Sequence, residues 1–323
     1  MIVTRTLNDL PEPGRSSIVS IGNYDGLHRG HQAVLSTVVQ RARRQRGTST
    51  VITFDPHPLK VLHPERAPQM ILPLTERIRL VEELGVERML VLEFTLPFSR
   101  TPAAAFVEEV LVKGLRCNEV YLGRNFRFGR DREGGVELLQ QMGADHGFRA
   151  ISAKEVRYKE FIISSTLVRS TLADGQVALA RRILGRPFTL MGKVVRGEGR
   201  GHSLDFPTAN LELENEIVPC EGVYITRAVL PGRTYGAATN IGRRPTFGGH
   251  QIVTETHLLD CRENLYGTPL RLEFLRRLRD ERAFEDPDAL RLQIKRDVAR
   301  VRDYFRRLRP RRRTLVRRRR AHG

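Results

Sequence analysis

Apolar runs alternate with amphipathic segments along the first half of the chain. Five runs predict strands, at residues 17–21, 49–54, 89–94, 119–122 and 148–152. Four segments with helical spacing of their apolar residues lie between them, at residues 30–44, 75–84, 102–112 and 135–142. A regular succession of strand and helix predicts a parallel α/β sheet wrapped by helices. Ligands of such sheets bind at the carboxyl ends of the strands.

The pattern changes after Gly185-Arg186-Pro187, which has the composition of a linker. Six short alternating runs follow, at residues 191–195, 209–213, 223–229, 237–241, 252–259 and 270–274. Closely spaced short strands predict a small antiparallel β-barrel, and a long amphipathic helix is predicted at residues 287–306. We therefore expect an α/β domain, a β domain and a basic, disordered tail, at residues 1–184, 185–309 and 310–323.

The length of 323 residues suits two domains, and 40% hydrophobic with 28% charged residues is typical of a globular protein. No apolar run approaches the roughly 18 residues of a membrane span, and residues 1–10 lack the features of a secretory signal. The three cysteines are widely spaced, which argues against a disulfide framework and a zinc site. We expect a cytoplasmic protein.

The net charge of +18 is concentrated at the end of the chain. Ten arginines and no acids lie at or after Arg306, which leaves +8 for the rest. The arginine-rich tail is either a contact for a polyanion such as RNA, or a self-repelling segment without a dedicated partner. The remaining +8 suits an enzyme whose substrates are mostly phosphates.

A glycine-rich loop follows the first predicted strand and leads to two histidines, His28 and His31. The histidines are three residues apart at a predicted helix start, so they share one face. Unpaired amides and the positive dipole end of that helix favour phosphate. The two imidazoles are therefore candidates for donating hydrogen bonds to phosphate oxygens during a transfer reaction. The alternative for either histidine alone is a surface residue without a ligand.

Here the sequence resembles nucleotidyltransferases, because His28-x-Gly30-His31 matches their HxGH signature. The loop Gly22-Asn23-Tyr24-Asp25-Gly26 is similar to the adenylyltransferase module of bacterial FAD synthetases, which usually carry Phe where this chain has Tyr24. Three further segments, at residues 53–58, 123–129 and 163–169, match the same module in their order and spacing. The resemblance implies a Rossmann-like nucleotidyltransferase domain in which the phosphate of FMN attacks the α-phosphorus of ATP, giving FAD and pyrophosphate.

The same resemblance implies roles for particular residues. His28 and His31 are expected to be catalytic. The expected ATP- and phosphate-binding residues are Gly22, Asn23, Tyr24, Asp25, Gly30, Ser164, Ser165, Thr166 and Arg169. The expected flavin-binding residues are Asn125, Phe126 and Phe128, since two aromatic rings with a polar group suit a planar flavin. Taken alone, the two phenylalanines also fit core positions, and the serines also fit helix caps.

The second half lacks the GxxxxGK[ST] pattern of P-loop enzymes. Thr208 and Asn210 point to the same side of an extended segment and offer neutral oxygens suited to Mg²⁺ and phosphate, although a turn into a strand explains the pair as well. The segment around them resembles the riboflavin kinase module. Matching residues continue at 222–224, 240–247, 253–260, 265–267, 278–281 and 284. The resemblance implies ATP-dependent phosphorylation of riboflavin to FMN.

Within that module the resemblance implies a glutamate general base, Glu255, with ATP and phosphate at Gly192, Gly197, Thr208 and Asn210. It places Mg²⁺ at Thr208 and Asn210, and the flavin at Arg279 and Phe284. Alternation puts Glu255 on the strand face of Val253 and His257, where apolar surroundings would raise its pKa. The residues alone leave open whether this face is apolar or solvent-exposed.

Both resemblances together indicate the bacterial bifunctional riboflavin kinase/FAD synthetase family, and they cover the chain from about Gly22 to Phe284. The expected ligands are riboflavin, FMN, ATP and Mg²⁺, with FMN and FAD as products and no membrane partner. Asp205 stands where the kinase module usually has glycine, and His202 stands where it usually has arginine. These two departures put the rate of the kinase reaction in question, but not the fold. The alternatives are an enzyme with one working module, and a nucleic-acid-binding or regulatory protein acting through the arginine tail.

Overall fold

A computed structural model describes residues 1–10, 15–196, 206–246 and 249–308 of the chain. The chain divides into two compact units. The first unit contains Met1–Phe188 together with Glu214–Pro219, and the second contains Thr189–Leu213 and the residues from Cys220 onward. No helix among the described residues is long and apolar enough to cross a membrane.

A six-stranded parallel sheet forms the centre of the first unit. Its strands are β1 (Ile2–Thr4), β2 (Ser17–Ile21), β3 (Thr48–Asp55), β4 (Arg88–Glu93), β5 (Cys117–Gly123) and β6 (Arg149–Ala153), in the order β1-β4-β3-β2-β5-β6. The chain adds strands on one side of β2 and then, with β5, on the other. The carboxyl end of β2 is therefore the place where such sheets bind ligands.

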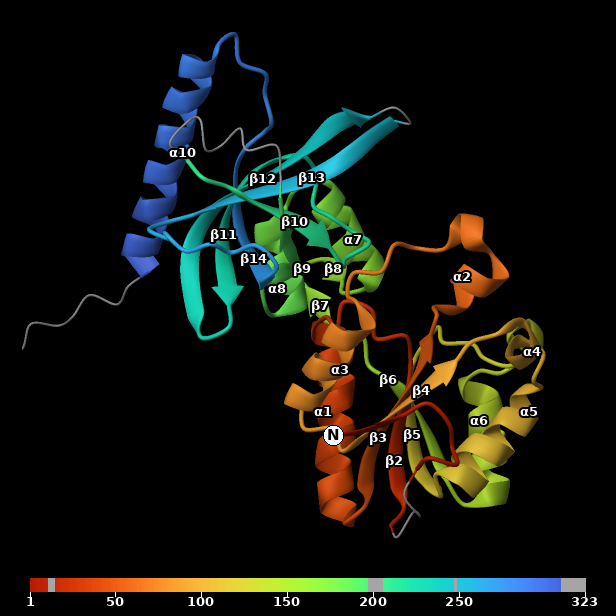
Figure 1. Ribbon diagram of the computed structural model, residues 1–323. Helices are drawn as coiled ribbons and strands as arrows, with labels where there is room; N and C mark the ends of the chain where they lie inside the picture. The colour runs from red at the N-terminus through yellow and green to blue at the C-terminus, as the bar shows by residue number, and fades with distance from the viewer. Residues whose placement is uncertain (11–14, 197–205, 247–248, 309–323) are drawn as a thin grey trace, which may run out of the picture. The chain divides into compact units, whose positions relative to one another are not determined.

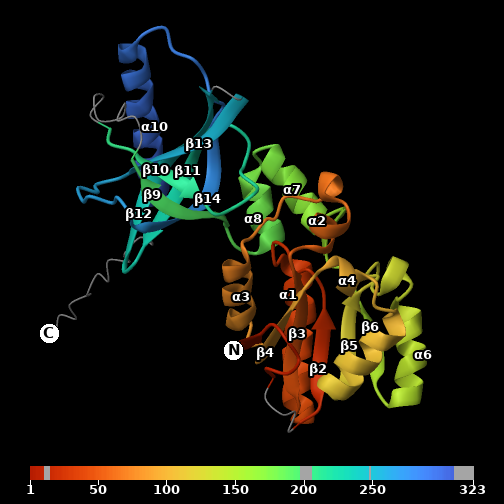
Figure 2. The ribbon, with the colours of Figure 1, turned by 45° about the vertical axis from the view of Figure 1, so that its right-hand side comes forward.

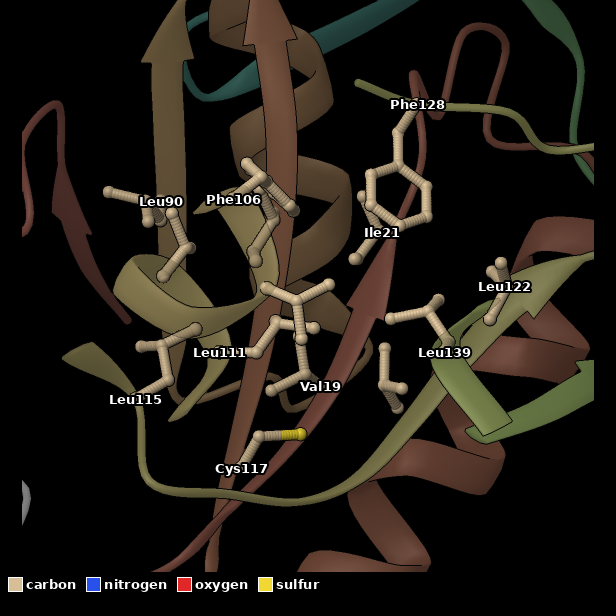
Figure 3. Close-up of a cluster of buried hydrophobic side chains, with 14 of the residues drawn as sticks. Val19, Ile21, Leu90, Phe106, Leu111, Leu115, Cys117, Leu122, Phe128 and Leu139 are labelled. Atoms are coloured by element: carbon tan, nitrogen blue, oxygen red, sulfur yellow. The ribbon is translucent and has the colours of Figure 1, made fainter. Parts of the chain in front are cut away.

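Helices cover both faces of this sheet (Figures 1 and 2). On one face, α1 (Arg29–Gln45) buries Val38 and Ala42 against Ile18 of β2. On the other face lie α5 (Ala103–Phe106), its π-helical continuation η2 (Val107–Gly114) and α6 (Val136–His146). Figure 3 shows Val19 and Ile21 of β2 among the buried side chains of this second face. Alternate side chains of β2 thus pack into the hydrophobic cores on opposite faces of the sheet, because successive side chains of a strand point to opposite sides.

Shorter elements complete the first unit. They are α2 (Pro58–Leu62), η1 (Pro64–Arg66), α3 (Leu74–Glu83), α4 (Leu96–Ser99), η3 (Arg130–Arg132), β7 (Arg157–Tyr158), β8 (Phe161–Ile162), α7 (Ser165–Ala173) and α8 (Val177–Leu184). The predicted strands and long helices of this half are all present. The sequence pattern did not predict β1, α2, α4, β7, β8 or α8.

The second unit is a closed barrel with the strand order β10-β13-β12-β11-β14-β9. Its strands are β9 (Phe188–Val195), β10 (Ala209–Leu213), β11 (Gly222–Leu230), β12 (Arg233–Thr246), β13 (Gly249–Leu258) and β14 (Pro269–Arg279). Buried hydroxyls bridge three adjacent strands inside it, because Thr239 Oγ1 lies 2.7 Å from Thr226 Oγ1 and 2.9 Å from Thr256 Oγ1. The predicted barrel is therefore confirmed.

One long helix, α10 (Pro287–Leu308), packs on the outside of this barrel. Val298 and Val301 of α10 are buried against Ile225 of β11 and Leu275 of β14. The outward face of the barrel wall is therefore partly apolar, and the helix predicted at residues 287–306 is confirmed. The predicted tail at residues 310–323 lies outside the described residues.

Candidate active sites

The two histidines lie at the start of α1, directly beyond the carboxyl end of β2. His28 caps the helix, because its Nδ1 accepts a hydrogen bond from the backbone N–H of His31 at 3.3 Å. The two imidazole rings stack with centroids 3.7 Å apart and planes inclined by 18°. Gly30 makes room for this arrangement, since a Cβ there would lie 3.1 Å from the His28 ring.

Both imidazoles are neutral near pH 7. Burial lowers the pKa of His28 to about 4, and burial together with His28 lowers the pKa of His31 well below its usual range. Because Nδ1 of His28 accepts a hydrogen bond, its proton resides on Nε2, which is free to donate. The buried Nδ1 of His31 has no hydrogen-bond partner within the described part of the chain. The start of α1 therefore offers uncharged donors, which suit phosphate oxygens.

The loop between β2 and α1 is fixed by an arginine that the sequence pattern did not single out. Arg186 Nη2 donates to the Gly26 carbonyl oxygen at 2.8 Å, and Nη1 donates to the Leu27 carbonyl oxygen at 3.1 Å. Gly26 has a φ of +78°, a conformation that favours glycine. The sequence indicates only a linker at Arg186, so the role of this residue is visible only in the structure.

Tyr24 and Asp25 make their hydrogen bonds within the unit. The Tyr24 hydroxyl is buried and donates to Ser20 Oγ at 2.5 Å, and burial raises its pKa. Asp25 Oδ1 accepts from the backbone N–H of Ile71 at 2.9 Å and of Leu72 at 3.3 Å. Burial raises the pKa of Asp25, and nearby cations partly offset this. These two predicted ATP-binding residues therefore shape the loop from inside.

The start of α7 joins this loop through Asp25. Arg169 Nη2 donates to Asp25 Oδ2 at 2.5 Å, and Ser165 Oγ donates to the Asp25 carbonyl oxygen at 2.8 Å. Ser164 caps α7 by accepting from the Leu167 N–H at 3.2 Å, as the capping alternative predicted. Thr166 is exposed. The structure thus brings Ser165 and Arg169 of the predicted phosphate ligands into contact with the histidine loop.

Asn23 connects the loop to the end of β3. Its carbonyl oxygen accepts from Arg77 Nη1 at 3.0 Å, and its side-chain amide lies 2.9 Å from His57 Nε2. His57 Nδ1 accepts from the Leu59 N–H at 3.2 Å, so Nε2 carries the proton and the amide oxygen of Asn23 is the suitable partner. Burial lowers the pKa of His57 to about 4. Sequence reasoning missed Arg77, which is 2% exposed.

The predicted flavin residues of the first unit differ in exposure. Phe128 is buried in the core, with its ring centroid 5.5 Å from that of Phe106 (Figure 3). Phe126 is half-buried, and its ring stacks on Phe128 with centroids 6.2 Å apart. Asn125 is exposed in the turn after β5. Phe128 therefore occupies a core position, which was the alternative interpretation of the two phenylalanines. The side chains of Asn125 and Phe126 remain accessible to a ligand.

A second cluster lies on the outer wall of the barrel. One row of facing residues crosses five strands in the order Asn210, Glu255, Asn240, Val223 and Arg279. Direct partners in antiparallel strands share one face. Thr254 and Thr256, which flank Glu255, are buried in the barrel interior at 1% and 0% exposure. Glu255 therefore points outward, which resolves the orientation that the sequence left open.

This outward face borders a cavity of about 780 Å³. Predicted residues lining it are Thr208, Glu255, Arg279 and Phe284; further lining residues are Asn240 and His257. His257 Nδ1 lies 2.9 Å from the Pro207 carbonyl oxygen, which ties the segment carrying Thr208 to β13. Asn210 faces Glu255 across the strands without lining the cavity. The carboxylate thus lies in a pocket large enough for an organic ligand.

An ion-pair network holds the cavity wall to α10. Arg279 Nε donates to Asp297 Oδ2 at 2.9 Å, and Gln293 Nε2 donates to Asp297 Oδ1 at 2.9 Å. Asp297 is 2% exposed. The guanidiniums of Arg279 and Arg282 lie 5.8 and 4.9 Å from the ring centroid of Phe284. Sequence reasoning missed Gln293 and Asp297, because each looks like an ordinary polar residue of an amphipathic helix.

The remaining predicted kinase residues have different placements. Gly192 allows β9 and β10 to approach closely, since a Cβ there would lie 2.1 Å from the Glu212 carbonyl oxygen. Gly197, His202 and Asp205 lie outside the described residues. Within the described part of the chain, no group of three or more His, Cys, Asp or Glu side chains has the arrangement of a metal site.

Comparison with known proteins gives consistent matches. The FAD synthetase family model matches residues 10–167, and the riboflavin kinase family model matches residues 184–305. A curated bifunctional riboflavin kinase/FMN adenylyltransferase from Escherichia coli K12 is 36% identical, and the match covers 94% of this chain and 98% of the Escherichia coli protein. The Pseudomonas fluorescens protein of the same description is 38% identical, and the match covers 94% of this chain and 97% of that protein. A solved structure named macrolide-efflux protein, from Streptococcus pneumoniae, matches with a TM-score of 0.84 at 30% sequence identity. The match covers 94% of this chain and 98% of the solved chain.

Proposed function

This chain belongs to the family of bifunctional riboflavin kinases/FMN adenylyltransferases, and from that premise we propose which of its residues carry out each reaction. The enzyme phosphorylates riboflavin with ATP to give FMN, and it joins FMN to the AMP moiety of ATP to give FAD with release of pyrophosphate. We assign the second reaction to the first unit and the first reaction to the barrel. The observation that carries this assignment is the presence of one separate cluster of predicted site residues in each unit.

In the adenylylation reaction, a phosphate oxygen of FMN attacks the α-phosphorus of ATP and pyrophosphate leaves. No side-chain nucleophile is needed, so catalysis consists of alignment and stabilisation of the developing charge. Nε2–H of His28 and the imidazole of His31 donate to the phosphate oxygens. Arg169 supplies positive charge from the other side of the loop, and Asp25 positions its guanidinium, as their 2.5 Å hydrogen bond supports. Asn125 and Phe126 contact the flavin.

In the kinase reaction, Glu255 accepts the proton of the terminal ribityl hydroxyl while that oxygen attacks the γ-phosphorus of ATP, and ADP leaves. The outward direction of Glu255 into the cavity of about 780 Å³ supports this role. Phe284 and the guanidinium of Arg279 offer flat surfaces for the flavin ring, and cation–π contacts hold them together. Thr208 lies at the same cavity and binds the phosphates of ATP.

The donor set of the barrel suits Mg²⁺. Thr208 and Asn210 offer neutral oxygens and Glu255 offers a carboxylate, and these hard ligands leave coordination positions for phosphate oxygens and water. Thr208 and Asn210 would hold the ion beside the phosphates. When bound, Mg²⁺ neutralises charge on the transferred phosphoryl group.

Incubation of the purified protein with riboflavin, ATP and Mg²⁺ tests both activities, with FMN and FAD followed over time. FMN is expected to form first and FAD to follow from it. A parallel incubation with FMN and ATP isolates the second reaction. If riboflavin yields no FMN while FMN yields FAD, only the first unit is active, and the reverse result leaves only the barrel active.

The arginine-rich tail is a separate question. We propose that residues 310–323 make an accessory contact with a polyanion and take no part in either reaction. A chain ending at Pro310 is expected to keep both activities and to lose salt-sensitive RNA binding. Loss of either activity on truncation would contradict this.

A further inference from the structure

A short segment of the first unit lies, in the sequence, between two strands of the barrel. Glu214–Pro219 follows β10 and precedes β11, yet it belongs to the same compact unit as the parallel sheet. Asn215 and Ile217 within it are only 8% and 6% exposed. A loop that merely joined two strands would leave these side chains in solvent. The segment is therefore not a simple loop, and it belongs to the packing of the first unit.

The segment binds the backbone of the stretch Met70–Leu72. Glu216 Oε2 accepts a hydrogen bond from the Met70 N–H at 2.9 Å. Asn215 Nδ2 donates to the Ile71 carbonyl oxygen at 3.3 Å. Glu216 also forms an ion pair with Lys60 of α2. Because Lys60 and Glu216 are both partly exposed, the ion pair adds little, and the two backbone contacts are the stronger attachment.

The same stretch also binds Asp25, and Asp25 in turn binds Arg169. On its other side, the N–H groups of Ile71 and Leu72 donate to the Asp25 carboxylate, which accepts from Arg169 Nη2. Arg169 Nε donates in addition to the Gln69 carbonyl oxygen at 2.9 Å. Both hydrogen-bonding edges of the Arg169 guanidinium therefore depend on where residues 69–72 lie.

The segment also lines a small cavity together with His57 and Arg77, the two side chains that contact Asn23. This cavity of about 80 Å³ is lined by His57, Lys60, Met70, Arg77 and Glu216, among others. The cations Lys60 and Arg77 and the Met70 hydrogen bond lower the pKa of Glu216, against the effect of burial. The carboxylate is therefore ionised at neutral pH and remains an acceptor for Met70.

We propose that Asn215 and Glu216 are positioning residues of the adenylylation site, acting through residues 69–72 and Asp25 on Arg169. The inference rests on the proposed function of the first unit. It means that the FAD-forming site is completed by a segment encoded within the kinase half of the sequence. The first 184 residues alone therefore lack part of the support of this site.

The test compares full-length variants in each reaction separately. In the double variant N215A/E216A, the KM for ATP in FAD formation from FMN is expected to rise about tenfold, since the hydrogen bonds that hold Met70 and Ile71, and through them Arg169, are lost. The rate of FMN formation from riboflavin is expected to stay near that of the unaltered protein, and the melting temperature is expected to fall by only a few degrees, as for the loss of about two hydrogen bonds. The single variant Glu216→Gln keeps an oxygen acceptor for Met70, so its KM is expected to return toward the original value.

The matched control is Glu212→Ala, which removes an exposed glutamate from β10 and is expected to change neither reaction. An unchanged KM and kcat for FAD formation in N215A/E216A would overturn the proposal. So would a parallel fall of both activities with the melting temperature, because the segment would then only stabilise the fold. An unaltered protein that makes no FAD from FMN and ATP would instead refute the proposed function of the first unit.

Discussion

The imidazole rings of His28 and His31 lie face to face beyond β2, with their centroids 3.7 Å apart. Two stacked rings at this distance cannot both be charged without strong repulsion, and burial already favours the neutral form of each. In the proposed mechanism the pair therefore meets a polyphosphate as hydrogen-bond donors that need no rearrangement of solvent. Preorganised donors of this kind are worth most where charge develops during the reaction.

Replacement of His28 by asparagine tests this role without removing the helix cap. Asparagine is a favourable cap residue and can accept from the His31 N–H, so α1 is expected to stay intact. The kcat for FAD formation is expected to fall about 100-fold, as for loss of one preorganised donor. FMN formation by the barrel is expected to be unchanged. His146→Asn, at an exposed position of α6, is the control, and a normal FAD rate in His28→Asn would remove His28 from the mechanism.

The same histidine makes stability depend on pH. The pKa of His28 is about 4 in the folded protein and about 6.5 when unfolded, so the unfolded chain binds the extra proton between these values. The free energy of unfolding therefore falls as the pH falls through this range, and it is constant above it. Between pH 7 and pH 5 the original protein is expected to lose about 2 kcal/mol more than His28→Asn does. Urea titrations of both proteins at the two pH values measure this, and equal losses would contradict the assigned pKa.

The elements of the fold were largely predictable because their pattern is local. The apolar run at residues 17–21 is β2, and the alternation at residues 209–213 is β10. The missed β1 has only three residues, which is too short for a period to be recognised. The end of β12 was underestimated, because Pro245 within it interrupts the strand pattern.

The supporting contacts of the sites were not predictable, because they join residues far apart in the sequence. Arg77 contacts Asn23 across 54 positions, and Glu216 contacts Met70 across 146. Nothing in the neighbourhood of Arg77 distinguishes a buried arginine from the many exposed ones. The histidine loop was recognisable from the sequence because the residues of a predicted phosphate site lie together at one strand–helix junction.

Glu255→Gln separates the two activities. Glutamine keeps the size of the side chain and loses the ability to accept a proton, so FMN formation is expected to fall by about 100-fold or more. FAD formation from supplied FMN is expected to continue, because Glu255 belongs to the barrel unit. Assays of the two half-reactions on one preparation measure this. Retained kinase activity in Glu255→Gln would rule out Glu255 as the base.

Tyr24→Phe tests whether the loop tyrosine has a structural or a chemical role. The Tyr24 hydroxyl donates to Ser20 Oγ, and Ser20 keeps its own bond to the Tyr121 carbonyl oxygen at 2.9 Å when that donor is lost. The free energy of unfolding is expected to fall by about 1 kcal/mol, as for one hydrogen bond. The rate of FAD formation is expected to stay within twofold. A large loss of that rate would show that the hydroxyl contacts a substrate.

Asp297 links the stability of the barrel to the cavity in which we propose that the flavin binds. Asp297→Ala leaves the Arg279 guanidinium, which is 18% exposed, without its charged partner. The free energy of unfolding is expected to fall by about 2 kcal/mol, the range for hydrogen bonds to charged groups. Asp297→Asn keeps the shape and one acceptor oxygen, so a smaller loss is expected.

The kinetic effect of Asp297→Ala is expected in the KM for riboflavin, because Arg279 and Phe284 form part of the cavity wall and Asp297 does not contact the phosphates in the proposed mechanism. The kcat of the kinase reaction should change little, and FAD formation from FMN should not change. Steady-state kinetics at saturating ATP, with unfolding measured on the same samples, test both effects together. A fall in kcat at an unchanged KM for riboflavin would place Asp297 in phosphate transfer and contradict its role in holding the flavin wall.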